Sequence, residues 1–390
     1  MVVAITGITG LLGRNILFEL FKKHQHELDQ LTILAFGKEE GGKSLQARIR
    51  EMMEQDGQYY LQASDIAPFT RRIICIDWQL GAKGLNLNRD AIQTLQSYTI
   101  GLFIHAAATV DFRDTPKVKE VLHLINVAGT AQVIELCERL KVEQFLFIST
   151  AYVCGKKEGS IPPGIVDFSV EFRNPYERSK LEAEVLVREA WAAGKLKQAK
   201  IFRPSTICGR LLEPLPGQTN KFDVFYAWLA FFLRLKFKML GRVDFDQSAR
   251  LDLRLCFNPA GGLNIIPVDY AAKALIEVAL NGASEQDFHL AAPQDLANMV
   301  GIPQMLDFIK VQFPPFVASV PEALTPLERL YYERSVGKIY TPYISIQTMK
   351  FEVDSLLACL PAGFPDCPFA EGSNLTTLLQ FARQHNFGIQ

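Results

Sequence analysis

Short apolar runs rich in β-branched residues alternate, between Val2 and Leu290, with longer segments whose apolar residues recur at three- and four-residue spacing. The short runs predict buried strands and the longer segments predict amphipathic helices. This alternation is typical of a parallel sheet covered by helices on both faces. We expect strands at Val2–Thr6, Leu31–Ala35, Arg72–Asp77, Gly101–His105, Gln144–Ser149, Lys200–Arg203 and Phe288–Leu290. We expect helices at Leu12–Lys23, Ser44–Glu54, Val118–Leu140, Pro175–Ala193 and Val268–Leu280.

The alternation breaks after Gly209, where the proline-rich segment Leu212–Pro216 and an aromatic run follow. Strand and helix character returns over Gly262–Leu290 before a long tail. The pattern predicts an α/β protein with a Rossmann-type doubly wound parallel sheet and a smaller, mostly helical C-terminal substrate lobe. We expect residues 1–210 plus 262–292 to form the Rossmann domain, and residues 211–261 plus 293–390 to form the substrate-binding lobe.

The amino-acid composition limits the kinds of binding partner that are expected. The 390 residues carry 41 Lys and Arg against 42 Asp and Glu, so a nucleic-acid partner is not expected. The seven cysteines include no close C-x-x-C pair, which predicts reduced core residues and no metal site. The opening residues have no basic segment and cleavage site typical of a signal peptide, so we expect a cytoplasmic protein.

The aromatic run belongs to the segment Phe222–Leu240, which is too short to span a bilayer. We expect this segment to form a helix that covers the substrate site. A peripheral membrane contact through the same helix is the alternative.

A glycine-rich turn follows the first predicted strand and opens the first predicted helix, reading Thr6-Gly7-Ile8-Thr9-Gly10-Leu11-Leu12-Gly13. This is the context in which a dinucleotide-binding fingerprint is specific. The first glycine allows the tight turn, the second lets the backbone approach a pyrophosphate, and the third lets the helix pack closely on the strand. The free N–H groups at the helix start then face the phosphates. We therefore predict that residues 7 and 9–13 bind a dinucleotide.

The predicted second strand ends Ala35-Phe36-Gly37-Lys38, without the acidic residue that favours NAD. Cations follow at Lys43 and Arg48, which would suit a 2′-phosphate, so NADP(H) is favoured over NAD(H). Asp77, at the end of the third strand, is expected to accept a hydrogen bond from the adenine amine. The small residues Ala106, Ala107 and Ala108 leave room for the cofactor, and the preceding His105 is expected to be a satisfied core residue.

Hydride transfer to a carbonyl needs an acid for the oxygen, and a tyrosine whose pKa is depressed by a nearby ammonium can supply it. The chain has two Tyr-x-x-x-Lys spacings. Tyr152 and Lys156 lie in a glycine-lysine loop, where helical spacing is not expected. Tyr176 and Lys180 lie at the start of a long amphipathic helix, with Pro175 suited to its first turn. The second pair is preferred, and Thr150, which ends the fifth strand, is expected to share the substrate oxygen with Tyr176.

Together these residues resemble an extended short-chain dehydrogenase/reductase. The further matches are Asn126-Val127-Ala128-Gly129-Thr130, Ser149-Thr150-Ala151-Tyr152 and Arg203-Pro204-Ser205. Two more stretches, residues 105–112 and residues 38–44 followed by Arg48, resemble the branch that contains fatty acyl-CoA reductases and thioester reductase domains. The sequence departs from that branch at Phe36, where such reductases usually carry an arginine for the 2′-phosphate.

The resemblance implies reduction of an acyl thioester by NADPH to an aldehyde, and in some members onward to the alcohol. It implies that Tyr176 is the general acid, that Lys180 holds the ribose, that Thr150 orients the carbonyl, and that Pro204 and Ser205 contact the cofactor. The acyl group would arrive on coenzyme A or on an acyl carrier protein. Nucleotide-sugar epimerases or dehydratases and hydroxysteroid-type dehydrogenases share this scaffold and are the alternatives. A protein that senses the dinucleotide without catalysis is a further one.

Overall fold

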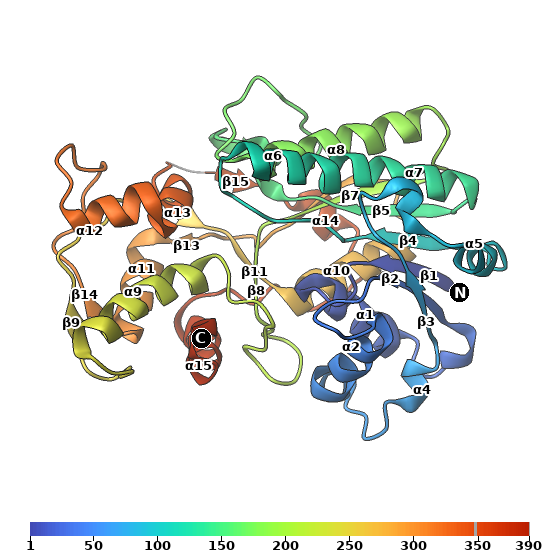
Figure 1. Ribbon diagram of the computed structural model, residues 1–390, viewed down its shortest axis with the longest axis horizontal. Coiled ribbons are helices and arrows are strands. Elements are labelled where there is room, and N and C mark those ends of the chain that lie inside the picture. The colour runs from blue at the N-terminus through green and yellow to red at the C-terminus, as the bar shows by residue number, and fades with distance from the viewer. Residues whose placement is uncertain (347–348, 390) are drawn as a thin grey trace.

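Seven strands pair in parallel, in the order β12-β7-β5-β4-β1-β2-β3, and form the sheet at the centre of the larger lobe (Figure 1). This computed structural model describes residues 1–346 and 349–389. Each strand that the sequence predicts is present within two residues of its expected bounds. The strands are β1 (Val2–Thr6), β2 (Thr32–Gly37), β3 (Ile73–Asp77), β4 (Leu102–His105), β5 (Gln144–Ile148), β7 (Ala199–Pro204) and β12 (Asp287–Leu290).

The direction of winding reverses at β1, which pairs with β2 on one side and with β4 on the other. Such a reversal leaves a crevice beyond the carboxyl ends of the strands, and this is where open parallel sheets bind ligands. Thr6, the last residue of β1, stands opposite Phe36 and His105 at this edge. The fold class predicted from the sequence is therefore confirmed, and the edge at Thr6 marks where the site should lie.

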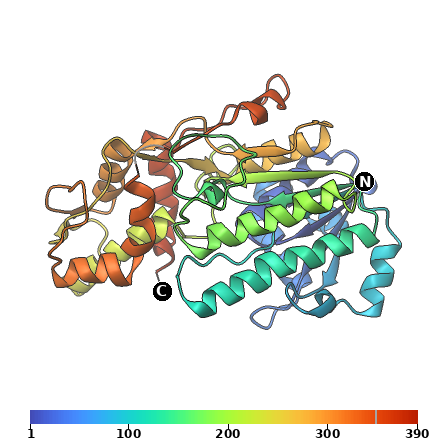
Figure 2. The same cartoon turned by 90° about the horizontal axis from the view of Figure 1, so that it is seen from above.

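Helices cover both faces of the sheet (Figures 1 and 2). On one face Val3 and Ile5 pack in a core with α1 (Leu11–Lys23), α2 (Leu45–Met52) and α10 (Val268–Leu280). On the other face Ala4 packs in a core with α5 (Arg89–Gln96), α7 (Gly129–Arg139) and α8 (Pro175–Ala192). Because side chains alternate across a strand, one apolar run supplies both cores.

The helix expected over Val118–Leu140 is interrupted. It consists of α6 (Pro116–Leu122), a π-helical segment η4 (His123–Ala128) and α7. A second π-helical segment, η2 (Met53–Gly57), follows α2 and extends beyond the end of the helix expected over Ser44–Glu54. Such bulges insert a residue into the helix and are frequent at functional sites. Periodicity alone does not reveal them, because the apolar face continues across the bulge.

The second lobe lies beside the carboxyl edge of the sheet and has an apolar core of its own (Figure 1). Its helices are α9 (Phe225–Leu240), α11 (Asn298–Phe308), α12 (Pro326–Arg329), α13 (Val336–Ile344) and α15 (Gly372–Gln384). Short strands complete it: β9 (Ala249–Arg250), β10 (Gly262–Leu263), β13 (Leu296–Ala297) and β14 (Val311–Gln312). Two-residue strands and several helices give the mostly helical lobe that the sequence indicates.

One side of helix α9 is buried in this lobe. Phe225, Trp228 and Phe232 are buried in the lobe core, and Met239 in the last turn is 59% exposed. The apolar face of the helix therefore packs on protein, which leaves little of it for a bilayer. Among residues 1–346 and 349–389, no helix combines the length and apolar character that crossing a membrane requires.

The chain returns to the larger lobe near its end. Strand β15 (Met349–Phe351) pairs with β6 (Gly159–Ile161), and α14 (Asp354–Ala358) packs beside β12. Leu356 is fully buried in the core beneath the sheet. The expected division assigns all of residues 293–390 to the substrate lobe. The segment from β15 to α14 instead crosses back to the larger lobe, which the sequence did not indicate. Another crossing is the pairing of β8 (Thr206–Cys208) with β11 (Ile265–Pro267).

Candidate active site

A cavity of about 710 Å³ runs from the glycine-rich turn, along the carboxyl edge of the sheet, into the second lobe. Most of the predicted site residues line it. They are Gly7, Thr9, Gly10, Leu11, Leu12, Gly13, Lys38, Arg48, Ala106, Ala107, Ala108, Thr150, Tyr176, Lys180, Pro204 and Ser205. Residues that are far apart in the sequence thus share one chamber. Lys43 and Asp77 are outside this set.

The glycine-rich turn has the close approaches that its sequence predicts. Gly7 has a φ of +70°, and a Cβ there would lie 2.8 Å from the backbone of Ala106 and Ala107. A Cβ on Gly13 would lie 2.1 Å from the carbonyl oxygen of Gly7. Only glycine fits these two positions. The turn therefore forms a backbone cradle at the start of α1, and this cradle fits the pyrophosphate of a dinucleotide.

The nucleotide end of the cavity is built around Arg48. Its guanidinium donates hydrogen bonds to Thr9 Oγ1 at 2.9 Å and to the carbonyl oxygen of Lys38 at 3.1 Å. It also forms an ion pair with Glu40 at 2.6 Å. Arg48 is thereby fixed between the glycine-rich turn and the end of β2. The carboxylate of Glu40 on this arginine was not foreseen from the sequence, since it enters from a turn beyond the strand.

Two predicted cofactor residues lie elsewhere. Lys43 forms an ion pair with Glu51 on the exposed face of α2, at 2.6 Å. Asp77 is exposed at the end of β3, and the next residues, Trp78 and Gln79, line the cavity instead. The structure therefore does not bring Lys43 or Asp77 to the wall of the cavity.

The first turn of α8 carries the candidate acid. Asn174 caps this helix by accepting a hydrogen bond from the backbone N–H of Glu177 at 3.0 Å, and Pro175 occupies the first helical position. Tyr176 and Lys180 then lie one turn apart on the same face. Thr150 follows β5 at the sheet edge. All three side chains face the same cavity, as the sequence predicts.

Burial controls the charges of this pair. It raises the pKa of Tyr176 well above the ordinary value, and the carboxylates of Asp223 and Glu177 raise it further. Burial lowers the pKa of Lys180 to about 7, against the opposing effect of Glu184. The expectation of a depressed tyrosine pKa is wrong for the protein alone, because burial and these two carboxylates all disfavour the phenolate. The phenol is therefore protonated at neutral pH, which is the state that a proton donor requires.

A buried asparagine links the loops around this pair. Asn126, within η4, accepts a hydrogen bond from the backbone N–H of Thr109 at 2.8 Å. Its amide donates to the carbonyl oxygen of Thr109 and to Ser179 Oγ, each at 3.0 Å. Asn126 in this π-helical segment therefore joins the loop after β4 to α8. Its sequence context was noted above, but this bridging role was not expected.

The two residues of the alternative pair, Tyr152 and Lys156, lie apart in the structure. Tyr152 lies in a short 3-10 turn, and its hydroxyl is 2.9 Å from Thr206 Oγ1. Lys156 points away and forms an ion pair with Glu171 on the surface. His105 is also accounted for, because its ring nitrogens contact hydroxyls of Thr6 and Thr130 at 2.8 and 3.2 Å. Burial lowers the pKa of His105 to about 3, so the ring is neutral and belongs to the core.

The second lobe supplies the far end of the cavity, which is mainly apolar. The apolar residues there come from α9, α11, α13 and the short strands between them: Phe225, Trp228, Leu263, Leu296, Ile302, Met305 and Ile344. Tyr340 and Tyr343 add hydroxyl groups from α13. The arrangement allows an apolar chain to enter from the lobe while its polar end meets Tyr176 and Thr150.

The fold and this site together define the class of protein, one built on the dinucleotide-binding fold of the extended short-chain dehydrogenase/reductases. Within that class the chain belongs to the male sterility protein family, whose model matches residues 5–275. The chain is 30% identical over 249 residues to fatty acyl-CoA reductase 2 of Homo sapiens, in a match covering 57% of this chain and 46% of that protein. The chain spans about half the length of the first curated relatives it matches.

Solved structures share the fold. The terminal R domain from the myxalamid PKS-NRPS biosynthetic pathway superposes with a TM-score of 0.75 at 21% identity, covering 99% of this chain and 91% of that one. UDP-glucuronic acid 4-epimerase from Bacillus cereus, in complex with NAD, superposes with a TM-score of 0.61 at 13% identity, covering 99% and 98%. At these identities the likeness establishes the fold alone.

Proposed function

We propose that this protein uses NADPH to reduce an acyl thioester, or the aldehyde derived from it, and releases an aldehyde or an alcohol. One cavity holds a dinucleotide cradle, the set of Thr150, Tyr176 and Lys180, and an apolar extension into the second lobe. This convergence carries the proposal. The apolar extension suits an acyl chain, because burying each methylene contributes about 0.8 kcal/mol.

The chain's residues would act on the substrate oxygen. A bound reduced nicotinamide supplies the hydride to the carbonyl carbon. As the hydride adds, Tyr176 donates its phenolic proton to the oxygen, and Thr150 orients that oxygen by a hydrogen bond. Lys180, buried one turn along α8, would bind the nicotinamide ribose. With a thioester substrate, the resulting hemithioacetal loses a thiol and becomes an aldehyde.

The preference for NADPH rests on Arg48 and Lys38, which line the nucleotide end of the cavity. The position expected for an NAD-selecting acid, at the end of β2, is Gly37. A 2′-phosphate at that end would meet the guanidinium of Arg48. Glu40 opposes this preference by its ion pair with the same arginine.

Fatty acyl-CoA reductases among the relatives support coenzyme A as one acyl donor. The resemblance of residues 38–44 and 105–112 to thioester reductase domains supports an acyl carrier protein as another. We also propose a cytoplasmic location. All seven cysteines are free thiols, which supports this proposal.

The decisive experiment mixes the protein with NADPH or NADH and a panel of acyl thioesters, aldehydes and nucleotide sugars, and follows the loss of reduced-nicotinamide absorbance. Turnover is expected with thioesters or aldehydes. Tyr176→Phe should keep dinucleotide affinity and lose turnover by about 100-fold or more. Tyr152→Phe is the comparison variant, since it removes the phenol of the alternative Tyr-x-x-x-Lys pair, which also lines the cavity. No oxidation with any thioester or aldehyde would rule the proposal out, and equal activity of Tyr176→Phe would exclude Tyr176 as the acid.

A further inference from the structure

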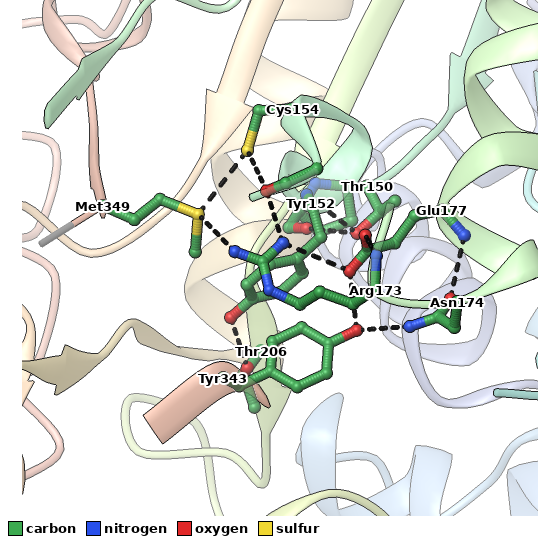
Figure 3. A network of polar contacts seen from close by, with 11 residues as sticks. Thr150, Tyr152, Cys154, Arg173, Asn174, Glu177, Thr206, Tyr343 and Met349 are labelled. Carbon is green, nitrogen blue, oxygen red and sulfur yellow. Dashed lines mark hydrogen bonds and ion pairs between the residues drawn. The ribbon is translucent and has the colours of Figure 1, made fainter. Parts of the chain in front are cut away.

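A phenol from the second lobe reaches the start of the catalytic helix (Figure 3). Tyr343, near the end of α13, donates a hydrogen bond to Glu177 Oε1 at 2.7 Å. The side-chain amide of Asn174 donates to the same phenol oxygen at 2.7 Å. Tyr343 therefore contacts α8 through two polar groups, and it also lines the cavity.

These two groups are the ones that build the first turn of α8. Asn174 is the N-cap, and Glu177 is the residue whose backbone N–H that cap binds. The carboxylate of Glu177 also accepts a hydrogen bond from the backbone N–H of Arg173 at 3.0 Å. Tyr176 lies between the two contacts. The phenol of Tyr343 thus contacts the residues on either side of Tyr176 in the sequence, Asn174 and Glu177, and so fixes the turn that carries the candidate acid.

The contacts are shielded from water. Glu177 is fully buried, Asn174 is 7% exposed, and the side chain of Arg173 has no exposed surface. The guanidinium of Arg173 lies 5.0 Å from the ring centre of Tyr343, and the ring of Tyr152 packs edge-on against it at 5.2 Å. Hydrogen bonds in such surroundings are strong, and leaving one partner unsatisfied is costly. The ring is therefore held in one position.

The element that carries Tyr343 also forms the substrate end of the cavity. Tyr340 and Ile344, on the same helix, line that end. We propose that Tyr343 is a positioning residue, which fixes the first turn of α8 so that Tyr176 faces the substrate carbonyl and links this placement to the seating of α13 on the substrate. The inference rests on the proposed function for its effect on turnover. Its structural part stands without a substrate.

Tyr343→Phe tests it, since this variant removes the two hydrogen bonds and keeps the ring. We expect kcat to fall about 10- to 100-fold, with KM and Kd for the dinucleotide unchanged. Amide hydrogen exchange of residues 176–180 should become faster. Tyr332→Phe is the control, because it removes a buried hydroxyl that bonds Arg254 and Cys256 within the lobe, away from the cavity.

Glu177→Gln provides a second arm. Glu177 and Tyr343 share one hydrogen bond, and each has a further partner in Arg173 or Asn174, so the double variant should lose less kcat than the product of the two single losses. If the two losses multiply, or if Tyr343→Phe changes kcat and exchange no more than Tyr332→Phe does, the positioning role is refuted. Exchange is measured without substrate, so it decides the role even if the wild type reduces nothing. If the wild-type protein reduces no thioester or aldehyde, the proposed function would be overturned instead.

Discussion

Arg48 should decide which dinucleotide the protein prefers. It is held at the cavity wall by Thr9 and Lys38, so it meets a 2′-phosphate without first having to be ordered. Replacing it by glutamine removes charge-assisted hydrogen bonds worth about 1.5–3 kcal/mol, or about 10- to 150-fold in affinity. We therefore expect Arg48→Gln to weaken NADPH binding by that factor and to leave NADH binding within about threefold.

Glu40 should have the opposite effect. Its side chain is 66% exposed, so its ion pair with Arg48 is worth at most about 1 kcal/mol. Releasing the arginine by Glu40→Gln should tighten NADPH binding by up to about fivefold and leave NADH unchanged or weaker. Lys43→Gln is the matched control, since this cation precedes α2, pairs with Glu51 of that helix and lies outside the cavity. It should alter neither affinity.

Isothermal titration calorimetry with both reduced dinucleotides, at one ionic strength, measures these affinities without a substrate. Equal weakening of NADPH and NADH by Arg48→Gln would refute the reasoning, because Arg48 would then act by supporting Thr9 and the glycine-rich turn. No change in either affinity would show that the 2′-phosphate binds elsewhere.

Two further predictions concern stability. Lys180 has a pKa of about 7 in the folded state, below the value near 10.4 in the unfolded state. Between these two pH values the unfolded state binds one more proton than the folded state. The free energy of unfolding should therefore rise with pH across that window. The melting temperature of Lys180→Met should therefore exceed that of the wild type most at pH 6.5 and less at pH 9, whereas a constant difference would contradict a buried ammonium. Gly13→Ala places a Cβ 2.1 Å from the carbonyl oxygen of Gly7 and should cost about 1–3 kcal/mol and abolish NADPH binding. Gly10→Ala, at 3.1 Å from the same oxygen, should unfold at a higher temperature than Gly13→Ala, and the reverse order would show that the turn is not packed in this way.

The parts of the fold that were predictable are those that the local sequence specifies. The first strand, the glycine-rich turn and α1 follow one another without interruption, and Gly13 is required by the carbonyl group of Gly7 in the same turn. Tyr176 and Lys180 were preferred to Tyr152 and Lys156 because Pro175 marks a helix start. This choice needed only a few residues of context, and the structure places the preferred pair in the cavity.

The parts that were missed depend on contacts between distant segments. Tyr343 meets Glu177 across 166 positions, and the packing of the lobe decides that meeting. The direction of the Tyr176 pKa shift was wrong for a related reason. The motif indicates an ammonium nearby, but only the folded structure reveals how completely both groups are desolvated. Glu40 was overlooked because it reaches Arg48 from a turn and not from the strand end.

The late return of the chain through β15 and α14 has a practical consequence. Leu356 completes the hydrophobic layer beneath the sheet, and β15 gives β6 its partner strand. The larger lobe therefore needs a segment that comes, in sequence, after most of the second lobe. A shortened protein ending before residue 349 would expose both surfaces to water. Exchanging substrate pockets between relatives therefore calls for grafts with several junctions, and a single fusion point would leave the recipient sheet incomplete.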